Sequence, residues 1–185
     1  MDVYFTQFNK EHTGLAFNFQ VNPDSCGNPE HYENYLRFIA LTDRRIGKGV
    51  THVLIHKDSI SGTEMIIGFV TLRASSLISE DDNDILGSAA IEIAEIAIDK
   101  LYERQGYGKT ILDFVFLLVD DMRTSTIGVE YVIACADSAS VSFYEKNDFV
   151  KLSEYYEIPR EGWNRNCIPM ALKLPEITMQ LHPIE

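Results

Sequence analysis

The chain has 185 residues, of which 45% are hydrophobic and 24% are charged, with 28 acidic residues against 16 basic ones and a net charge of −12. This length and composition predict one globular domain spanning residues 1–185. No apolar run approaches the ~18 residues of a membrane-spanning helix, and the first ten residues do not resemble a signal peptide, so we expect a cytoplasmic protein that does not enter a membrane.

The acidic charge disfavours partners with a phosphate backbone, because proteins that bind nucleic acids usually present a basic face. A local patch around Arg44, Arg45 and Lys48 leaves that possibility open. An anionic ligand would have to be held by local donors rather than by the field of the whole protein.

The three cysteines are far apart in the sequence and include no C-x-x-C pair. An odd, sparse set disfavours a disulfide framework and is typical of a reducing compartment, so we expect Cys135 to pack within its apolar segment. The five histidines are dispersed and interpreted as surface or supporting residues. No cluster has the spacing of metal ligands, and we expect no metal site.

The first half of the chain predicts three strands and one helix. Apolar residues recur at helical spacing where Tyr32, Tyr35, Leu36 and Ile39 fall on one face. The expected elements are a strand at residues 3–8, a helix at 29–41, strands at 51–56 and 65–72 joined by a turn at 59–63, and an acidic loop at 79–84.

The second half begins with a strand rich in Ile and Ala and continues with an amphipathic helix, a buried strand and a short helix capped by Asp137 or Ser138. The expected elements are a strand at residues 89–98, a polar glycine turn at 100–107, a helix at 108–123, a strand at 129–136, a helix at 138–146 and strands at 149–158 and 167–174. This order predicts a mixed α/β sheet rather than a regular βαβ repeat.

The turn E-R-Q-G-Y-G-K-T at residues 103–110 joins a strand to a helix. Its two glycines let the backbone approach a ligand closely, and the free amides of the first helical turn make an anion site. Lys109 and Thr110 can add side-chain donors. The spacing is neither that of a P-loop nor that of a dinucleotide-binding fingerprint, and a plain tight turn into a helix is the alternative interpretation.

Together with the preceding strand, which ends Glu95-Ile-Ala-Ile-Asp99, this turn resembles the acetyl-CoA motif [Q/R]-x-x-G-x-[G/A] of the GNAT superfamily of N-acetyltransferases. Residues 142–149, S-F-Y-E-K-N-D-F, resemble the F-Y-x-x-x-G-F element of the same family. The resemblance implies a mostly antiparallel central sheet with flanking helices and a splayed strand pair, and it implies acetyl-CoA as the acyl donor. Glu103 and Asp148 depart from the usual residues, although Asp tolerates the left-handed backbone that Gly supplies.

The resemblance also assigns the donor site. The backbone of the long strand would hold the pantetheine arm, the turn would hold the phosphates, and two residues before the last helix would touch the adenosine or the pantetheine. Tyr144 matches the tyrosine that faces the sulfur and protonates the leaving thiolate; the alternative for it is a core aromatic. The residues implied in cofactor binding are Ile96, Ala97, Ile98, Arg104, Gln105, Gly106, Tyr107, Gly108, Lys109, Thr110, Asp137 and Ser140.

Glu92 and Glu95 are the candidate bases, because burial in so apolar a strand would raise the pKa of a carboxyl towards a useful range. They are three residues apart, so strict alternation places only one in the cleft unless a bulge intervenes. A solvent-facing or structural glutamate, with a water relay in place of a base, remains the alternative for each.

The acceptor is not specified by these motifs. A primary amine of a small molecule or protein is the first hypothesis, and the acidic charge favours a cationic one. Segments such as Cys26-Gly27-Asn28 and Ile168-Pro169-Met170 are similar to acetyltransferase toxins of toxin–antitoxin pairs, which implies aminoacyl-tRNA as acceptor and an antitoxin as partner. A non-enzymatic CoA-binding module is the third hypothesis. Loops, including the one with Trp163, would shape the acceptor site, and residues 177–184 could pack on a second subunit of a homodimer.

Overall fold

The computed structural model describes residues 2–81, 84–152 and 167–176, which build a seven-stranded sheet in the order β1-β2-β3-β4-β5-β7-β6. All neighbouring strands are antiparallel except β4 and β5, which are parallel. This confirms the predicted mixed α/β fold with its mostly antiparallel sheet. The strands are β1 (Asp2–Gln7), β2 (Val50–Lys57), β3 (Glu64–Asp81), β4 (Asp84–Ile98), β5 (Tyr131–Ala136), β6 (Val150–Lys151) and β7 (Ile168–Lys173).

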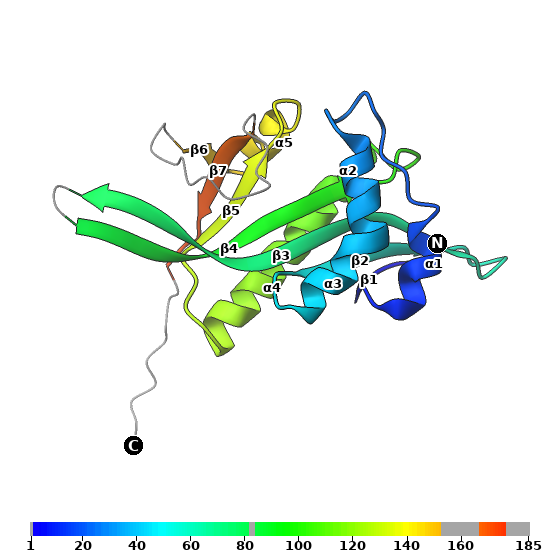
Figure 1. Ribbon diagram of the computed structural model, residues 1–185, viewed down its shortest axis with the longest axis horizontal. Helices are drawn as coiled ribbons and strands as arrows, with labels where there is room; N and C mark the ends of the chain where they lie inside the picture. Colours follow the sequence, from blue (N-terminus) through cyan, green and yellow to red (C-terminus); the bar gives the residue numbers. More distant parts are fainter. Residues whose placement is uncertain (1, 82–83, 153–166, 177–185) are drawn as a thin grey trace, which may run out of the picture.

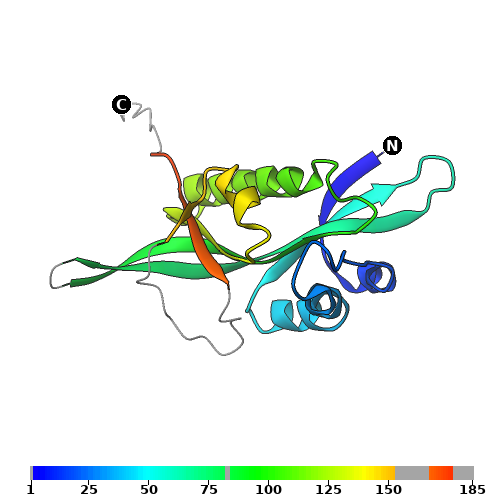
Figure 2. The same ribbon diagram turned by 90° about the horizontal axis from the view of Figure 1, so that it is seen from above.

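Helices cover both faces of the sheet (Figures 1 and 2). The C-terminal pair, α4 and α5, lies on one face, and the N-terminal helices lie on the other. Each layer has its own core, one around Ile111 and Val115 and the other around Phe19 and Leu36. The helical elements are η1 (Lys10–His12), α1 (Thr13–Ala16), α2 (Pro29–Asn34), the π-helix η2 (Tyr35–Ile39), α3 (Ala40–Arg45), α4 (Tyr107–Ser125) and α5 (Val141–Glu145).

Helix α4 forms where residues 108–123 predict it, with one residue more at its start and two more at its end. Ile111, Leu112, Val115 and Val119 recur at intervals of one helical turn and are fully buried. The helix approaches the sheet closely at Gly68, where an added β-carbon would lie 2.9 Å from a methyl group of Ile111. The absent side chain therefore sets the distance between α4 and β3.

The helix predicted at residues 29–41 is continuous with α3 and contains a π-helical segment in its middle. Asn28 caps its start by accepting a hydrogen bond from the backbone N–H of His31 at 3.2 Å, and Pro29 occupies the first helical position. The π segment adds a residue to one turn, which sequence periodicity does not reveal.

Strands β3 and β4 continue past the sheet as a two-stranded ribbon, the long arm seen in Figures 1 and 2. Their pairing runs out to Asp81 and Asp84. The prediction of a loop at residues 79–84 is therefore wrong for residues 79–81 and 84. A ribbon that extends beyond the core can pair through its backbone without alternating apolar and polar residues, so a polar, acidic sequence does not rule out a strand there.

Two expectations near the C-terminus also need correction. The short helix begins at Val141 rather than Ser138, and neither Asp137 nor Ser138 caps it; Ser140 precedes it and makes no side-chain cap. The strand predicted at residues 149–158 is described only as β6, and residues 153–158 lie outside the described residues, as do Trp163 and residues 177–184.

Cys135 and Cys167 form a disulfide between β5 and the start of β7, whereas Cys26 is free. The expectation that the cysteines stay unpaired is therefore wrong for this pair. The two residues are 32 positions apart in sequence, and only the antiparallel pairing of β5 with β7 brings them together.

Candidate functional site

The parallel strands β4 and β5 separate halfway along their length. They pair from Ala90 opposite Tyr131 to Ile93 opposite Ala134, and no further pairing follows. A cavity of about 900 Å³ lies at this separation and is lined by residues 93–98 of β4. The splayed strand pair expected from the sequence is therefore present, and it forms one wall of the cavity.

Most of the predicted site residues line this one cavity. They come from β4, from the glycine turn, and from the segment between β5 and α5. The predicted residues in the lining are Glu95, Ile96, Ala97, Ile98, Arg104, Gly106, Gly108, Lys109, Asp137, Ser140 and Tyr144. Glu92, Gln105, Tyr107 and Thr110 are predicted residues that do not belong to the lining.

Beyond the separation, the backbone of β4 offers donors to the cavity. Asp99 donates its N–H to the carbonyl of Ile67 in β3 at 2.9 Å. Because successive N–H groups of a strand point to opposite sides, those of Ile96 and Ile98 face away from β3 and into the gap beside β5. The N–H of Ala97 faces β3, so only two of the three predicted residues can serve as backbone donors there.

The glycine turn has the backbone geometry of an anion site. Gly106 precedes the first residue of α4 with φ of 91°, in the left-handed region, and Thr110 donates its N–H to the Gly106 carbonyl at 3.1 Å. The amides of the first helical turn, from Tyr107 to Lys109, therefore remain available for a ligand. Gly108 lies where an added β-carbon would meet the ring of Phe143 at 3.2 Å, so the turn also packs tightly against α5.

The carboxylate of Glu103, the residue that departs from the signature in the glycine turn, is hydrogen-bonded to residues of the N-terminal segment. One of its carboxylate oxygens accepts hydrogen bonds from Ser25 at 2.7 Å and Asn22 at 3.1 Å. Gln105 donates from its side chain to the carbonyl of Leu101 at 2.9 Å. Arg104 and Lys109 are thus the cationic residues of the turn that line the cavity, although Lys109 also pairs with Asp113 at 2.6 Å.

Tyr144 combines nearly complete burial with a place on the cavity wall. Its side chain is 3% exposed and packs edge to face against Phe143 and Phe149, with ring centroids 5.3 Å and 5.1 Å apart. Burial raises the pKa of its hydroxyl, and the nearby carboxylates of Asp137 and Glu95 add to that shift. The hydroxyl therefore stays protonated and can act as a proton donor.

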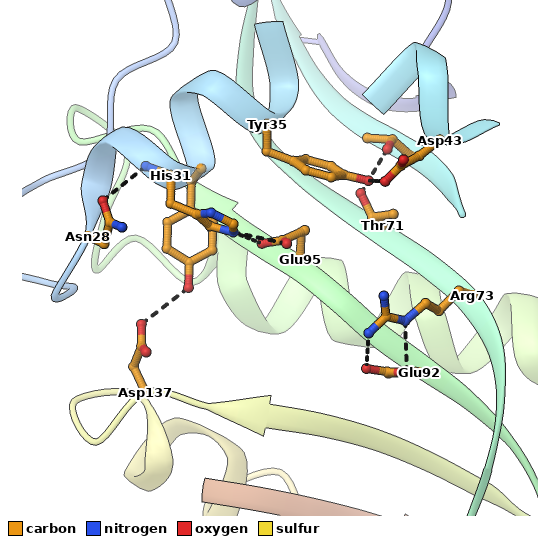
Figure 3. A network of polar contacts seen from close by, with 11 residues as sticks. Asn28, His31, Tyr35, Asp43, Thr71, Arg73, Glu92, Glu95 and Asp137 are labelled. Atoms are coloured by element: carbon orange, nitrogen blue, oxygen red, sulfur yellow. Dashed lines mark hydrogen bonds and ion pairs between the residues drawn. The ribbon is translucent and has the colours of Figure 1, made fainter. Parts of the chain in front are cut away.

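Glu92 and Glu95 face the same side of the sheet. Glu92 pairs with Arg73 and Glu95 with Thr71, while Ala94 is an extra residue without a partner in the β3–β4 ladder. Because of this β-bulge, the side chains of Glu92 and Glu95 point to the same face of the sheet instead of to opposite faces, as Figure 3 shows.

The two glutamates nevertheless have different surroundings. Glu92 is 3% exposed and receives two hydrogen bonds from the guanidinium of Arg73, at 2.8 Å and 2.5 Å. Buried and held by a fixed cation, it has the environment of a structural ion pair. Glu95 lines the cavity, so it is the better placed of the two candidate bases.

Helix α2 adds two residues that sequence reasoning did not assign to the site. His31 contacts both carboxylate oxygens of Glu95 through Nε2 at 3.0 Å, and Tyr32 lines the cavity and donates its hydroxyl to Asp137 at 3.2 Å. The contact of His31 with Glu95 spans 64 sequence positions. A single histidine at the start of a helix carries no sequence signal for such a contact.

The described parts of the chain contain no helix long and apolar enough to cross a membrane. Among the same residues, no three His, Cys, Asp or Glu side chains are grouped so that they could hold a metal ion.

Comparison with known proteins links this geometry to a family. Residues 48–151 match the family model described as acetyltransferase (GNAT) domain. No curated protein matches the chain in sequence.

Several solved structures share the fold over nearly the whole chain, including the three that follow. A bacterial toxin is 21% identical, with a TM-score of 0.69, over 93% of this chain and 90% of that chain. AtaT complexed with acetyl-methionyl-tRNAfMet is 15% identical, with a TM-score of 0.68, over 91% and 94%. AtaTR bound with acetyl-CoA is 15% identical, with a TM-score of 0.71, over 93% and 94%.

Proposed function

The chain belongs to the GNAT acetyltransferase family, and we propose that it transfers an acetyl group from acetyl-CoA to a cationic primary amine of a small molecule or protein by direct attack. The observation that carries this proposal is that one cavity joins the glycine turn, the strand separation, Tyr144 and Glu95. These are the parts needed to hold the donor, protonate its sulfur and deprotonate an amine.

The donor half of the cavity fits an extended anionic molecule. The amides at the start of α4, with Arg104 and Lys109, would hold the phosphates. The N–H groups of Ile96 and Ile98 would bond the amide oxygens of the pantetheine arm in the gap where β5 turns away. Backbone donors of this kind let a protein with net charge −12 bind an anion.

The reaction starts from the neutral amine, which forms when the ammonium gives a proton to water, and it then requires two further proton transfers. As the amine nitrogen bonds to the carbonyl carbon and the carbon–sulfur bond breaks, Glu95 takes a proton from the nitrogen and Tyr144 gives one to the thiolate. The raised pKa of Tyr144 keeps its proton in place until the sulfur leaves. Glu95 and Tyr144 both line the cavity, which allows the two transfers to occur around one reacting centre.

Local charge supports a cationic acceptor. Glu95 and Asp137 line the part of the cavity beside α2, and Tyr32 adds an aromatic wall next to them. Carboxylates and an aromatic face attract an ammonium group and repel a polyanion.

Aminoacyl-tRNA is a second candidate acceptor, and the observation that favours it is the fold shared over 91% of this chain with AtaT complexed with acetyl-methionyl-tRNAfMet. It requires a basic surface near the cavity. The cations considered for this surface are Arg44, Arg45, Lys48, Arg123 and Lys151. Of these, Arg44 is partly engaged because it donates to the carbonyl of Phe8 at 3.2 Å. An antitoxin partner belongs to this second proposal, whereas a homodimer is compatible with either acceptor.

Calorimetry with acetyl-CoA tests the donor site. We expect binding in the wild type and its loss in Gly106→Glu, which places a carboxylate at the anion site. Gly62→Glu is the matched control, because Gly62 also has a positive φ, 70°, but lies in the β2–β3 turn away from the cavity. Equal binding by the wild type and Gly106→Glu would reject the assigned phosphate site.

Turnover tests the acceptor. Release of free CoA thiol is measured with spermidine and, separately, with methionyl-tRNA. Turnover of spermidine supports the first proposal, and turnover of methionyl-tRNA alone supports the second. Binding of acetyl-CoA without turnover of either would favour the non-enzymatic CoA-binding module.

A further inference from the structure

We propose that His31 is a positioning residue for acetyl transfer, which fixes the carboxylate of Glu95 at the cavity wall and controls its strength as a base through its own charge. This inference rests on the proposed function and assigns to α2, outside the motifs that carry the donor site, a role in the proton transfer.

His31 contacts both carboxylate oxygens of Glu95 through a single ring nitrogen. Nε2 of His31 lies 3.0 Å from each carboxylate oxygen of Glu95. Figure 3 shows the imidazole reaching from α2 towards β4, where the carboxylate lies between the helix and the sheet. The Glu95 side chain is 16% exposed and that of His31 is 47% exposed. The pair therefore joins a group on the cavity wall to a group that exchanges protons with water.

The fold holds His31 in this orientation. The side chain of Asn28 accepts a hydrogen bond from the backbone N–H of His31, which fixes the residue at the start of α2. Its ring packs edge to face on Tyr32 at 5.2 Å and lies 6.5 Å from the ring of Tyr35. The imidazole is thus confined on its helix side and meets Glu95 on its sheet side.

The charged and titratable groups around His31 come from three elements. Glu95 approaches from β4, Asp137 from the segment after β5, and Tyr32 and Tyr35 from its own helix. The hydrogen bond to Glu95 is the largest cause that raises the pKa of His31, burial opposes it, and the charges of Glu95 and Asp137 add to the rise. The imidazole therefore gains its charge at a higher pH than an ordinary histidine.

The charge of His31 changes what Glu95 can do. A neutral imidazole can donate a hydrogen bond to the carboxylate and leave it basic enough to accept an amine proton. An imidazolium forms an ion pair with the carboxylate, and the stabilisation of that pair is lost when the carboxylate takes a proton. Glu95 then becomes a weaker base, so turnover should fall as the pH drops through the pKa of His31.

Two substitutions separate positioning from charge. In His31→Gln, the amide can still donate a hydrogen bond to Glu95 but carries no titratable charge. In His31→Ala, both are lost. His56→Gln is the matched control, because His56 contacts Tyr102 at 3.0 Å and takes no part in the cavity lining.

The measurement is kcat against pH at saturating spermidine, or methionyl-tRNA if the wild type turns over only that acceptor. We expect the acid limb of the wild type and of His56→Gln to have a midpoint above about 6.5, the ordinary histidine value. In His31→Gln the midpoint of the acid limb should move down by at least about one pH unit, because the titrating imidazole is gone. His31→Ala should also lose about tenfold or more at the plateau, since an oriented base contributes about 10²-fold or more.

An unmoved acid limb in His31→Gln would overturn the proposal, because a purely structural histidine lowers the rate without changing the profile. A ¹⁵N NMR titration of the His31 imidazole needs no acceptor and gives an independent answer. Glu95→Gln should lower its midpoint, and an unchanged midpoint would also overturn the proposal. Failure of both acceptors with the wild type counts against the proposed function instead, and the titration then decides whether the pair is coupled.

Discussion

At the residue scale, Tyr144 is the side chain whose chemistry depends most on where it is buried. It is packed by Phe143 and Phe149 and lines the cavity. In Tyr144→Phe the packing stays and the proton is lost, so we expect kcat to fall by about 10²-fold or more while acetyl-CoA binding is kept. Steady-state turnover and calorimetry measure the two effects. Loss of binding together with rate would indicate a packing role instead.

The His31–Glu95 contact also predicts how stability depends on pH. The pKa of His31 is raised in the folded protein, so the folded state holds the proton more tightly than the unfolded chain does. The resulting stability is complete below the unfolded value of about 6.5 and is lost as the pH rises through the raised folded value. We therefore expect the Tm advantage of the wild type over His31→Ala to be larger at about pH 6 than at about pH 9. Glu95→Gln should reduce that pH dependence, because it removes the largest cause of the raised pKa of His31.

The sequence could suggest Tyr144 but not His31. Tyr144 lies in a recognisable F-Y-x-x-x-x-F segment, and the two rings that pack against it, Phe143 and Phe149, belong to the same segment. The partner of His31 lies 64 positions away, and no local pattern encodes such a contact. Asp148 is an intermediate case: its φ of 66° confirms that Asp takes the left-handed conformation usually left to Gly.

At the element scale, the packing of α4 on β3 depends on the small size of Gly68. In Gly68→Ala the new β-carbon would lie 2.8 Å from Ile98 Cδ1, 2.9 Å from Ile111 Cδ1 and 3.2 Å from the backbone oxygen of Ala97. We expect a loss of about 1–3 kcal/mol in the free energy of unfolding, because the helix, the strand or both must shift. Gly87→Ala, with no atom within 4 Å of its β-carbon, should change stability by no more than about 0.5 kcal/mol. Urea unfolding compares the two, and equal effects would contradict this account.

Most element types and their order followed from periodicity, whereas the short helices η1 and α1 and the irregularities did not. The buried positions of α4 recur at helical spacing, so each of its ends was predictable to within two residues. The bulge at Ala94 was foreseen only as a possibility, and it decides that Glu92 and Glu95 share a face. The π segment of the N-terminal helix and the ribbon of β3 and β4 depend on tertiary contacts or on paired backbones. Neither leaves a clear apolar repeat in the sequence.

At the scale of the whole molecule, the Cys135–Cys167 disulfide joins two strands on the far side of the cavity from β3. Cross-linking residues 32 positions apart reduces the entropy of the unfolded chain, and a closed loop of that size is expected to stabilise the fold by about 3–4 kcal/mol. Urea unfolding with and without a thiol reductant measures this difference. In the double variant Cys135→Ser, Cys167→Ser, the reductant should not change the free energy of unfolding. The prediction would be contradicted if the reductant also left that of the wild type unchanged.

Beyond Ile93, β4 keeps β3 on one edge and, within the described residues, has no strand on the other. An acyl donor that meets the N–H groups of Ile96 and Ile98 takes the place of a strand for as long as it stays bound. Under the proposed binding mode, binding of the donor would give this edge of β4 a hydrogen-bonded neighbour, and release of the product would expose the edge again. The donor would then contribute to the stability of the sheet as well as to the reaction.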